Sequence, residues 1–221
     1  MRYRKNIIII GTAGNSIDVL DTINEINLVS KNTQYKCIGF LDDNEELWQN
    51  ELYGAKVLGP LSSALEYQDA FFIFAIGSPF NFWKREQIAA KTCLPIERFE
   101  TIIHPSASVS GMAKIGWGAV IFQNVTIASN VFIGDQVMIL PNSIISHNDT
   151  IGDYTCIAGG VSVSGEVTIG KFCYLGTNSA IIGNVNIGDC CLIGMGSTIL
   201  RDVPTNCVYV GSPGNFVRHT Q

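Results

Sequence analysis

Residues 127–156 read IASNVF IGDQVM ILPNSI ISHNDT IGDYTC, and each group of six opens with isoleucine. The spacing of six continues in both directions, so that seventeen consecutive positions from Ile103 to Ile199 hold Ile, Val or Leu. Ile-Gly pairs recur every eighteen residues, at 115–116, 133–134, 151–152, 169–170 and 187–188. One inward aliphatic side chain per six residues, with three sixes to a turn, predicts a parallel β-helix with a triangular cross-section.

The residue four places after each aliphatic position is small in nearly every hexad, as in Ala113, Val131, Ser143 and Cys173. Small side chains fit the narrow interior of such a coil beside the branched ones. We therefore expect several of the cysteines to be buried.

Residues 1–100 have no hexads and are expected to form a separate domain, with residues 101–221 as the second. Apolar runs at 7–10, 37–41 and 71–76 predict parallel strands, and helices are expected over about 16–26 and 82–91. A turn rich in glycine, Gly11-Thr12-Ala13-Gly14-Asn15, follows the first strand. This order is typical of a Rossmann-like nucleotide-binding unit, although the turn lacks the full GxGxxG spacing.

The composition excludes several classes of protein. Hydrophobic residues make up 47% and charged residues 15%, which is typical of a folded chain. The net charge of −5 argues against nucleic acid or an anionic membrane as a partner. Seven cysteines without a paired metal-ligand spacing, and three histidines, predict reduced thiols in a cytoplasmic protein without a metal site.

These features together resemble a known family. The turn at 11–15, Phe-Leu-Asp-Asp at 40–43, Ala-Ile-Gly at 75–77 and His-Pro-Ser-Ala at 104–107 precede the hexads. The chain thus resembles the nucleotide-sugar acetyltransferases of the bacillosamine and perosamine type and the related sialic acid O-acetyltransferases. The resemblance implies a left-handed parallel β-helix after the α/β domain, acetyl-CoA as co-substrate, no metal, and a homotrimer with the acetyl-CoA groove between subunits.

The resemblance also implies which residues bind the substrate, expected to be a UDP-linked sugar. These are Ala13, Gly14, Asn15, Asp42, Asp43 and Gly77. Asn15 departs from the family pattern, in which many members have histidine, but its amide can still donate a hydrogen bond.

For the β-helix, the resemblance implies His147 as general base, Asn148 as its neighbour and the backbone N–H of Gly165, eighteen residues later, as oxyanion donor. Acetyl-CoA contacts are expected at Cys156, Gly165, Thr177 and Met195, and the tail at 208–214 resembles the closing loop of the family. Cys156 stands where relatives have a second histidine, so a contact through its side chain is not expected to match theirs.

Asn148 stands where the family often has an acid that holds the imidazole, and Asp149 follows it. Asp149 either turns outward at a bulge and orients His147, or points inward and forms its hydrogen bonds within the coil. The hexad register favours the second arrangement, although a buried carboxylate needs partners.

The leading hypothesis is an enzyme that transfers acetyl from acetyl-CoA to the amino group of a UDP-linked 4-amino-4,6-dideoxy sugar. Acetylation of a sugar hydroxyl and a non-catalytic nucleotide-binding module are the alternatives. A nicotinamide-dependent oxidoreductase is the weakest candidate, because a GxGxxG turn and a separate catalytic domain are both missing.

Overall fold

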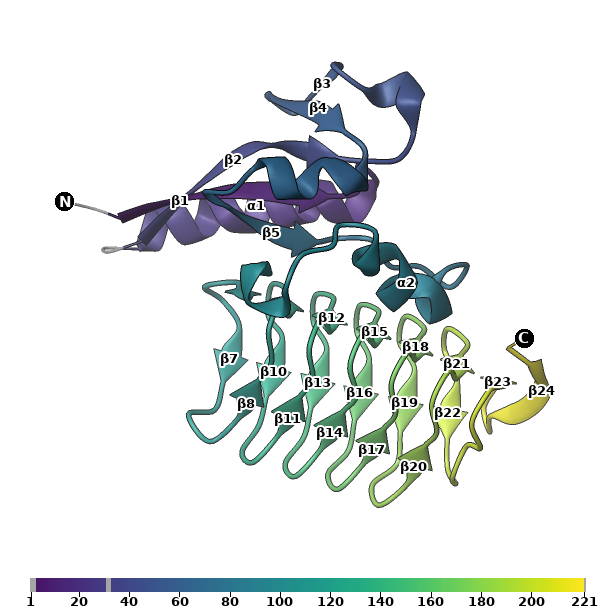
Figure 1. Cartoon of the computed structure of the whole chain (residues 1–221). Helices are drawn as coiled ribbons and strands as arrows, with labels where there is room; N and C mark the ends of the chain where they lie inside the picture. Colours follow the sequence, from purple (N-terminus) through teal and green to yellow (C-terminus); the bar gives the residue numbers. More distant parts are fainter. Residues whose placement is uncertain (1–2, 31–32, 221) are drawn as a thin grey trace.

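The computed structural model describes residues 3–30 and 33–220, which form two parts joined along one side (Figure 1). The N-terminal part holds a five-stranded sheet in the order β3-β4-β2-β1-β5. Its strands are β1 (Tyr3–Ile10), β2 (Thr33–Leu41), β3 (Glu51–Leu52), β4 (Ala55–Gly59) and β5 (Ala70–Phe74). Strands β1, β2, β4 and β5 are parallel, as expected for a Rossmann-like domain, and β3 pairs antiparallel with β4.

Two helices and several short 3-10 turns cover the sheet. Helix α1 (Gly14–Val29) begins two residues before the predicted start, inside the glycine turn. The helix expected over 82–91 is instead a 3-10 turn, Phe82–Lys84, followed by the short α2 (Arg85–Ala90). The remaining 3-10 turns are η1 (Glu45–Leu47), η2 (Leu61–Glu66) and η4 (Ile96–Arg98).

The hexad repeat forms the three-sided β-helix predicted from the spacing, with each coil pairing in parallel to the coil eighteen residues later. Sheet 1 faces the N-terminal domain and contains β6 (Ile102–Ile103), β9 (Val120–Ile121), β12 (Met138–Ile139), β15 (Cys156–Ile157), β18 (Tyr174–Leu175), β21 (Leu192–Ile193), β23 (Cys207–Val210) and β24 (Asn215–His219). Sheet 2 contains β7 (Ser108–Val109), β10 (Thr126–Ile127), β13 (Ile144–Ile145), β16 (Ser162–Val163), β19 (Ala180–Ile181) and β22 (Thr198–Ile199). Sheet 3 contains β8 (Lys114–Ile115), β11 (Phe132–Ile133), β14 (Thr150–Ile151), β17 (Thr168–Ile169) and β20 (Asn186–Ile187).

The aliphatic residue of each hexad fills the interior of the prism from Ile121 onward. The first coil differs, because no earlier coil covers it: Ile103 is 38% exposed, and Val109 and Ile115 are half-buried. Ile103 still faces inward as predicted, because it pairs in register with Ile121, and its exposure reflects the open end of the prism. Cys173 and Cys191 are buried, as expected from the small-residue positions, and Cys207, which lies beyond the last hexad, is buried as well.

The two parts share a hydrophobic core. Ile7 and Ile9 of β1 belong to the same buried cluster as Val120, Met138 and Cys156, which point outward from sheet 1. Figure 1 shows β12, β15, β18 and β21 lying closest to the N-terminal domain, whereas β14, β17 and β20 lie on the far side. Sheet 1 is thus the docking side of the prism.

Arg85, the first residue of α2, is fully buried where the two domains meet. Its guanidinium donates to the carbonyl oxygens of Ile76, Gln136 and Tyr154 at 2.7–2.8 Å, and it lies over the Phe74 ring. One side chain therefore ties the end of β5 to two successive coils.

No helix within residues 3–30 and 33–220 is long and apolar enough to cross a membrane.

Candidate active site

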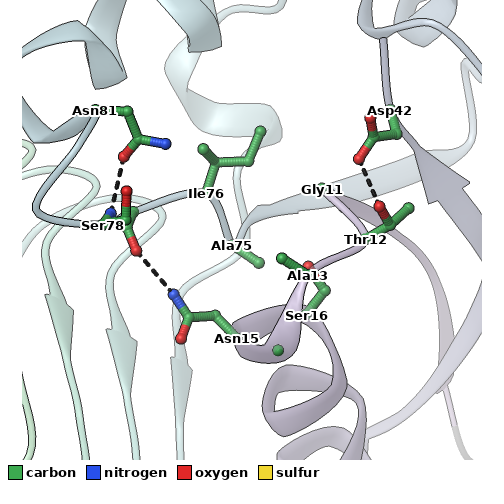
Figure 2. A pocket seen from close by; sticks show the side chains of 12 residues that line it. Gly11, Thr12, Ala13, Asn15, Ser16, Asp42, Ala75, Ile76, Ser78 and Asn81 are labelled. Carbon is green, nitrogen blue, oxygen red and sulfur yellow. Dashed lines mark hydrogen bonds between the residues drawn. The ribbon is translucent and has the colours of Figure 1, made fainter. Parts of the chain in front are cut away.

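A pocket of about 390 Å³ opens at the carboxyl ends of β1 and β5 (Figure 2). The chain passes from β1 to β2 on one side and returns to β5 on the other, so the pocket lies where the strand order reverses. Ligands of open α/β sheets bind at this switch point. Its lining residues are Gly11, Thr12, Ala13, Gly14, Asn15, Ser16, Asp42, Ala75, Ile76, Gly77, Ser78 and Asn81.

The N-terminus of α1 forms one wall of this pocket. Ala13 is the N-cap residue and provides no side-chain cap, so the first backbone N–H groups of α1 are directed at the pocket without a side-chain acceptor. Helix N-termini with free N–H groups bind phosphate, because the donors converge and the helix dipole favours negative charge. This wall suits a diphosphate.

Polar side chains are fixed around the pocket (Figure 2). Thr12 Oγ1 donates to Asp42 Oδ2 at 2.7 Å, which holds the carboxylate at the rim. Asn15 Nδ2 donates to the Gly77 carbonyl at 3.1 Å, which links the first turn of α1 to the segment after β5. The pocket is therefore shaped by contacts between the ends of three strands before any ligand enters.

Five of the six expected substrate-binding residues line this pocket: Ala13, Gly14, Asn15, Asp42 and Gly77. Asp43 does not line it, contrary to expectation. Its carboxylate accepts the Leu61 N–H at 3.0 Å and pairs with Lys91 at 2.7 Å on the surface. Burial alone would raise the pKa of Asp43, but the Lys91 and Leu61 hydrogen bonds outweigh it and lower the pKa. Both residues follow the end of β2, and their carboxylates are held apart by different partners, Thr12 for Asp42 and Leu61 with Lys91 for Asp43.

Four polar residues of the pocket were not predicted from the sequence: Thr12, Ser16, Ser78 and Asn81. Thr12 lies inside the glycine turn and could have been inferred from it. Ser78 and Asn81 come from the segment after β5, where Asn81 Oδ1 accepts the Ser78 N–H at 2.8 Å. That loop conformation has no signature in the sequence.

His147 lies at a corner of the prism between β13 and β14, and its side chain is exposed. Gly165, one coil later, lies directly against the ring: a Cβ atom at position 165 would be 2.7 Å from His147 Nε2. Only glycine leaves room for the imidazole there. Among the described residues, the Gly165 N–H has no hydrogen-bond acceptor, whereas its carbonyl accepts the Asn184 N–H.

The side chain of Asn148 contacts the same imidazole, with Asn148 Nδ2 at 3.2 Å from His147 Nδ1. Asp149 points into the prism, fully buried, and accepts the Val167 N–H at 2.9 Å. The arrangement favoured by the hexad register is confirmed. Burial raises the pKa of Asp149 to about 7, although the Val167 and Ser146 N–H groups partly counteract it.

A second cavity, of about 310 Å³, lies at the corner between sheets 1 and 2. Thr177 and Met195, two of the expected acetyl-CoA contacts, line it together with Pro79, Tyr174, Gly176, Leu192, Ile193 and Gly194. Met195 is 76% exposed, so the cavity is open to solvent on that side.

The contact with acetyl-CoA that was expected at Cys156 does not agree with the position of its side chain. Its thiol is 4% exposed and lies between the domains, where a Cβ atom on Gly77 would be 2.6 Å from its sulfur. The side chain therefore packs under the pocket of the N-terminal domain and does not line the cavity of Thr177 and Met195. Position 156 points outward from sheet 1, and the N-terminal domain covers that sheet.

The segment 77–82 lies between the two cavities. Ser78 and Asn81 line the pocket of the N-terminal domain, whereas Pro79 lines the cavity on the prism. His147 belongs to the opposite corner, which joins sheets 2 and 3 and is not covered by the N-terminal domain. One copy of the chain thus places both cavities on one side and the histidine on the other.

The chain thus combines an α/β domain that carries an open pocket with a prism of hexapeptide repeats on which that domain is docked. Within it, residues 6–92 match the PglD N-terminal domain, and residues 166–201 match the bacterial transferase hexapeptide repeat. No curated protein matches the chain by sequence comparison.

Solved structures with the same fold cover nearly the whole chain. The acetyltransferase domain of PglB from Neisseria gonorrhoeae superposes with a TM-score of 0.84 at 24% identity, over 96% of this chain and 100% of that one. PerB from Caulobacter crescentus, in complex with CoA and GDP-perosamine, gives 0.81 at 22% identity, over 96% and 97%. WeeI from Acinetobacter baumannii gives 0.79 at 22%, over 97% and 100%. The resemblance and the two-part fold expected from the sequence are confirmed.

Proposed function

We propose that the protein transfers the acetyl group of acetyl-CoA to the amino group of a nucleotide-linked 4-amino-4,6-dideoxy sugar. The observation that carries the proposal is the His147–Gly165 pair, a potential base in contact with a backbone whose N–H is free. The structural neighbours support it, because PerB was solved in complex with CoA and GDP-perosamine and a second PglB structure contains acetyl coenzyme A.

The nucleotide part of the substrate is expected in the pocket of the N-terminal domain. Its diphosphate would accept hydrogen bonds from the first N–H groups of α1, and Asp42 would accept from a ribose hydroxyl or a base N–H. UDP is the nucleotide proposed from the family resemblance. The sugar would leave the pocket along the segment 77–82 toward the prism.

The reaction needs a base because an amine is largely ammonium near neutral pH. His147 would take the proton as the amine nitrogen attacks the thioester carbonyl, and the Gly165 N–H would stabilise the oxyanion. The new C–N bond forms, the C–S bond breaks, and the proton held by the imidazole can pass to the departing CoA thiolate. The pantetheine arm would lie in the cavity of Thr177 and Met195.

The proposal includes a homotrimer, because one copy cannot bring these groups together. His147 lies at the corner opposite sheet 1, whereas both cavities lie on the side of the prism where the N-terminal domain docks. A neighbouring copy would supply the histidine to the groove formed by sheets 1 and 2. Closed rotational symmetry then gives every copy the same interface.

The test is an acetyl-CoA consumption assay with UDP-, GDP- and dTDP-linked 4-amino sugars, and with hydroxyl acceptors such as sialic acid. We expect turnover with at least one amino sugar, and a His147→Ala variant with kcat lower by about 10²–10⁴, the usual effect of a positioned base. His219→Ala, at an exposed histidine in β24, is the control and should retain activity. Turnover of hydroxyl acceptors alone, or a fully active His147→Ala variant, would contradict the proposal.

A further inference from the structure

The corner that carries His147 contains a short ladder of amide side chains. Asn130 and Asn148 occupy the same place in successive coils, and both have left-handed backbones, with φ of 59° and 62°. Asparagine tolerates this conformation better than most residues. Asn130 Nδ2 donates to Asn148 Oδ1 at 2.8 Å, and Asn148 Nδ2 lies 3.2 Å from His147 Nδ1.

The direction of this ladder decides where the imidazole proton lies. When Asn130 donates to Asn148 Oδ1, Asn148 can offer only its N–H groups to the ring, so His147 Nδ1 must accept. The neutral ring then carries its proton on Nε2. A base that works through Nε2 needs the opposite tautomer, with the proton on Nδ1.

The opposite tautomer requires both amides to turn over. His147 Nδ1–H would then donate to Asn148 Oδ1, and Asn148 Nδ2 would donate to Asn130 Oδ1. If Asn148 turned alone, two N–H groups would face each other. The orientation of Asn130 and the tautomer of His147 are therefore linked, although the two residues do not touch in the ladder.

We propose that Asn130 is a positioning residue that selects, through Asn148, the tautomer of His147. Its importance for catalysis rests on the proposed function, in which His147 is the base. Two acidic residues belong to the same corner. Glu166 donates its backbone N–H to the His147 carbonyl, and Asp149 turns its carboxyl into the prism. Both acids remain in place when only Asn130 is substituted.

The chain provides a matched control at another corner. Asn124 Nδ2 donates to Asn142 Oδ1 at 3.3 Å, with φ of 55° and 64° at the two residues, between sheets 1 and 2. This ladder has the same amide groups and left-handed backbones with a longer hydrogen bond, and among the described residues neither of its two side chains contacts a histidine. The ladder at Asn130 reaches an imidazole directly through the Asn148 side chain, whereas the Asn124 corner is linked to His104 only through its backbone N–H and the hydroxyl of Ser106.

The experiment is an Asn130→Asp substitution in the full chain, with the tautomer of His147 measured from two-bond nitrogen–proton couplings in ¹⁵N spectra. His147→Gln identifies the signals among the three histidines of the sequence. A carboxylate can only accept, so Asn148 must donate to it and present Oδ1 to the ring. We expect the ratio of Nδ1–H to Nε2–H forms to rise about tenfold, the effect of one hydrogen bond.

Asn124→Asp should leave the His147 couplings unchanged, and Asn130→Gly, which keeps the left-handed backbone accessible, should give a ratio between those of wild type and Asn130→Asp. Unchanged couplings in Asn130→Asp would overturn the inference, because a carboxylate at position 130 can only accept and must therefore turn Asn148 Oδ1 toward the ring. The measurement needs no turnover. If the tautomer shifts but His147→Gln remains active, the proposed base is wrong and the positioning role stands.

Discussion

The carboxyl group of Asp149 is buried inside the prism, beneath the turn that carries His147. Its pKa, raised to about 7, lies above that of an unfolded aspartate. The folded state therefore binds the proton more tightly, and stability must fall as the pH rises between the two pKa values. Above pH 8 the whole cost of the buried charge is present.

We expect Asp149→Asn to remove this pH dependence, because its amide oxygen can still accept the Val167 N–H. Relative to the variant, the wild type should lose about 2–4 kcal/mol of unfolding free energy between pH 4 and pH 8, at about 1.4 kcal/mol per pKa unit. Urea unfolding of both proteins at several pH values measures this difference in unfolding free energy. Asp202→Asn, at an exposed carboxyl that accepts the Asn186 N–H, is the control. Parallel pH profiles of wild type and Asp149→Asn would contradict the prediction.

The two adjacent acids after β2 should differ in their effect on nucleotide binding. Asp42 lies at the pocket, held by Thr12, whereas Asp43 is paired with Lys91 outside it. Asp42→Ala should weaken binding of UDP or GDP about 10- to 100-fold, the range for a hydrogen bond to a charged group. Asp43→Ala should bind as the wild type does. Isothermal titration calorimetry gives both values, and equal losses in the two variants would place the ligand elsewhere.

At the scale of elements, Arg85 at the start of α2 holds the domains together through three carbonyl oxygens. Arg85→Met would leave these buried acceptors unpaired, at a cost of about 3–5 kcal/mol. We expect calorimetry to show separate unfolding of the two domains in this variant. Lys84→Met, at the exposed preceding residue, is the control and should unfold like the wild type. A single unchanged transition in Arg85→Met would refute the connecting role.

The elements also show how far the sequence predicts this fold. The prism follows from the hexads, which place one inward side chain every six residues, and five of the twelve residues that line the pocket belong to the glycine turn after β1. The break between Phe82–Lys84 and α2 could not be predicted from the sequence. It depends on hydrogen bonds from Arg85 to carbonyl groups of two coils, 51 and 69 residues further along the chain. The burial of Cys156 has the same origin: contacts between domains override a local pattern.

At the scale of the whole molecule, the separation of His147 from the cavities predicts complementation between two inactive variants. His147→Ala removes the base, and Gly14→Val fills the pocket without a clash, because a Cβ atom there meets no atom within 4 Å. Each variant alone should be inactive. Co-expressed trimers should regain about a quarter of wild-type activity, since random mixing places an intact histidine beside an intact pocket in one site of four.

The assay is acetyl transfer by the purified mixture, with each variant carrying a different tag so that mixed oligomers can be isolated. A double variant, His147→Ala with Gly14→Val, mixed with wild type in the same ratio controls for dilution. No recovery in the isolated mixed oligomers would mean that base and pocket act within one copy, and a monomeric mass of the active protein by light scattering would lead to the same conclusion.

The pairing of each coil with the one eighteen residues later fixes how a chain of this kind can change in length. A gain or loss of one residue turns every later inward side chain toward solvent, whereas a gain of a whole coil preserves every contact and lengthens the prism by about 4.8 Å. Evolution can therefore lengthen the C-terminal end in uniform modules, each adding new outward positions, while the surface on which the N-terminal domain rests stays the same.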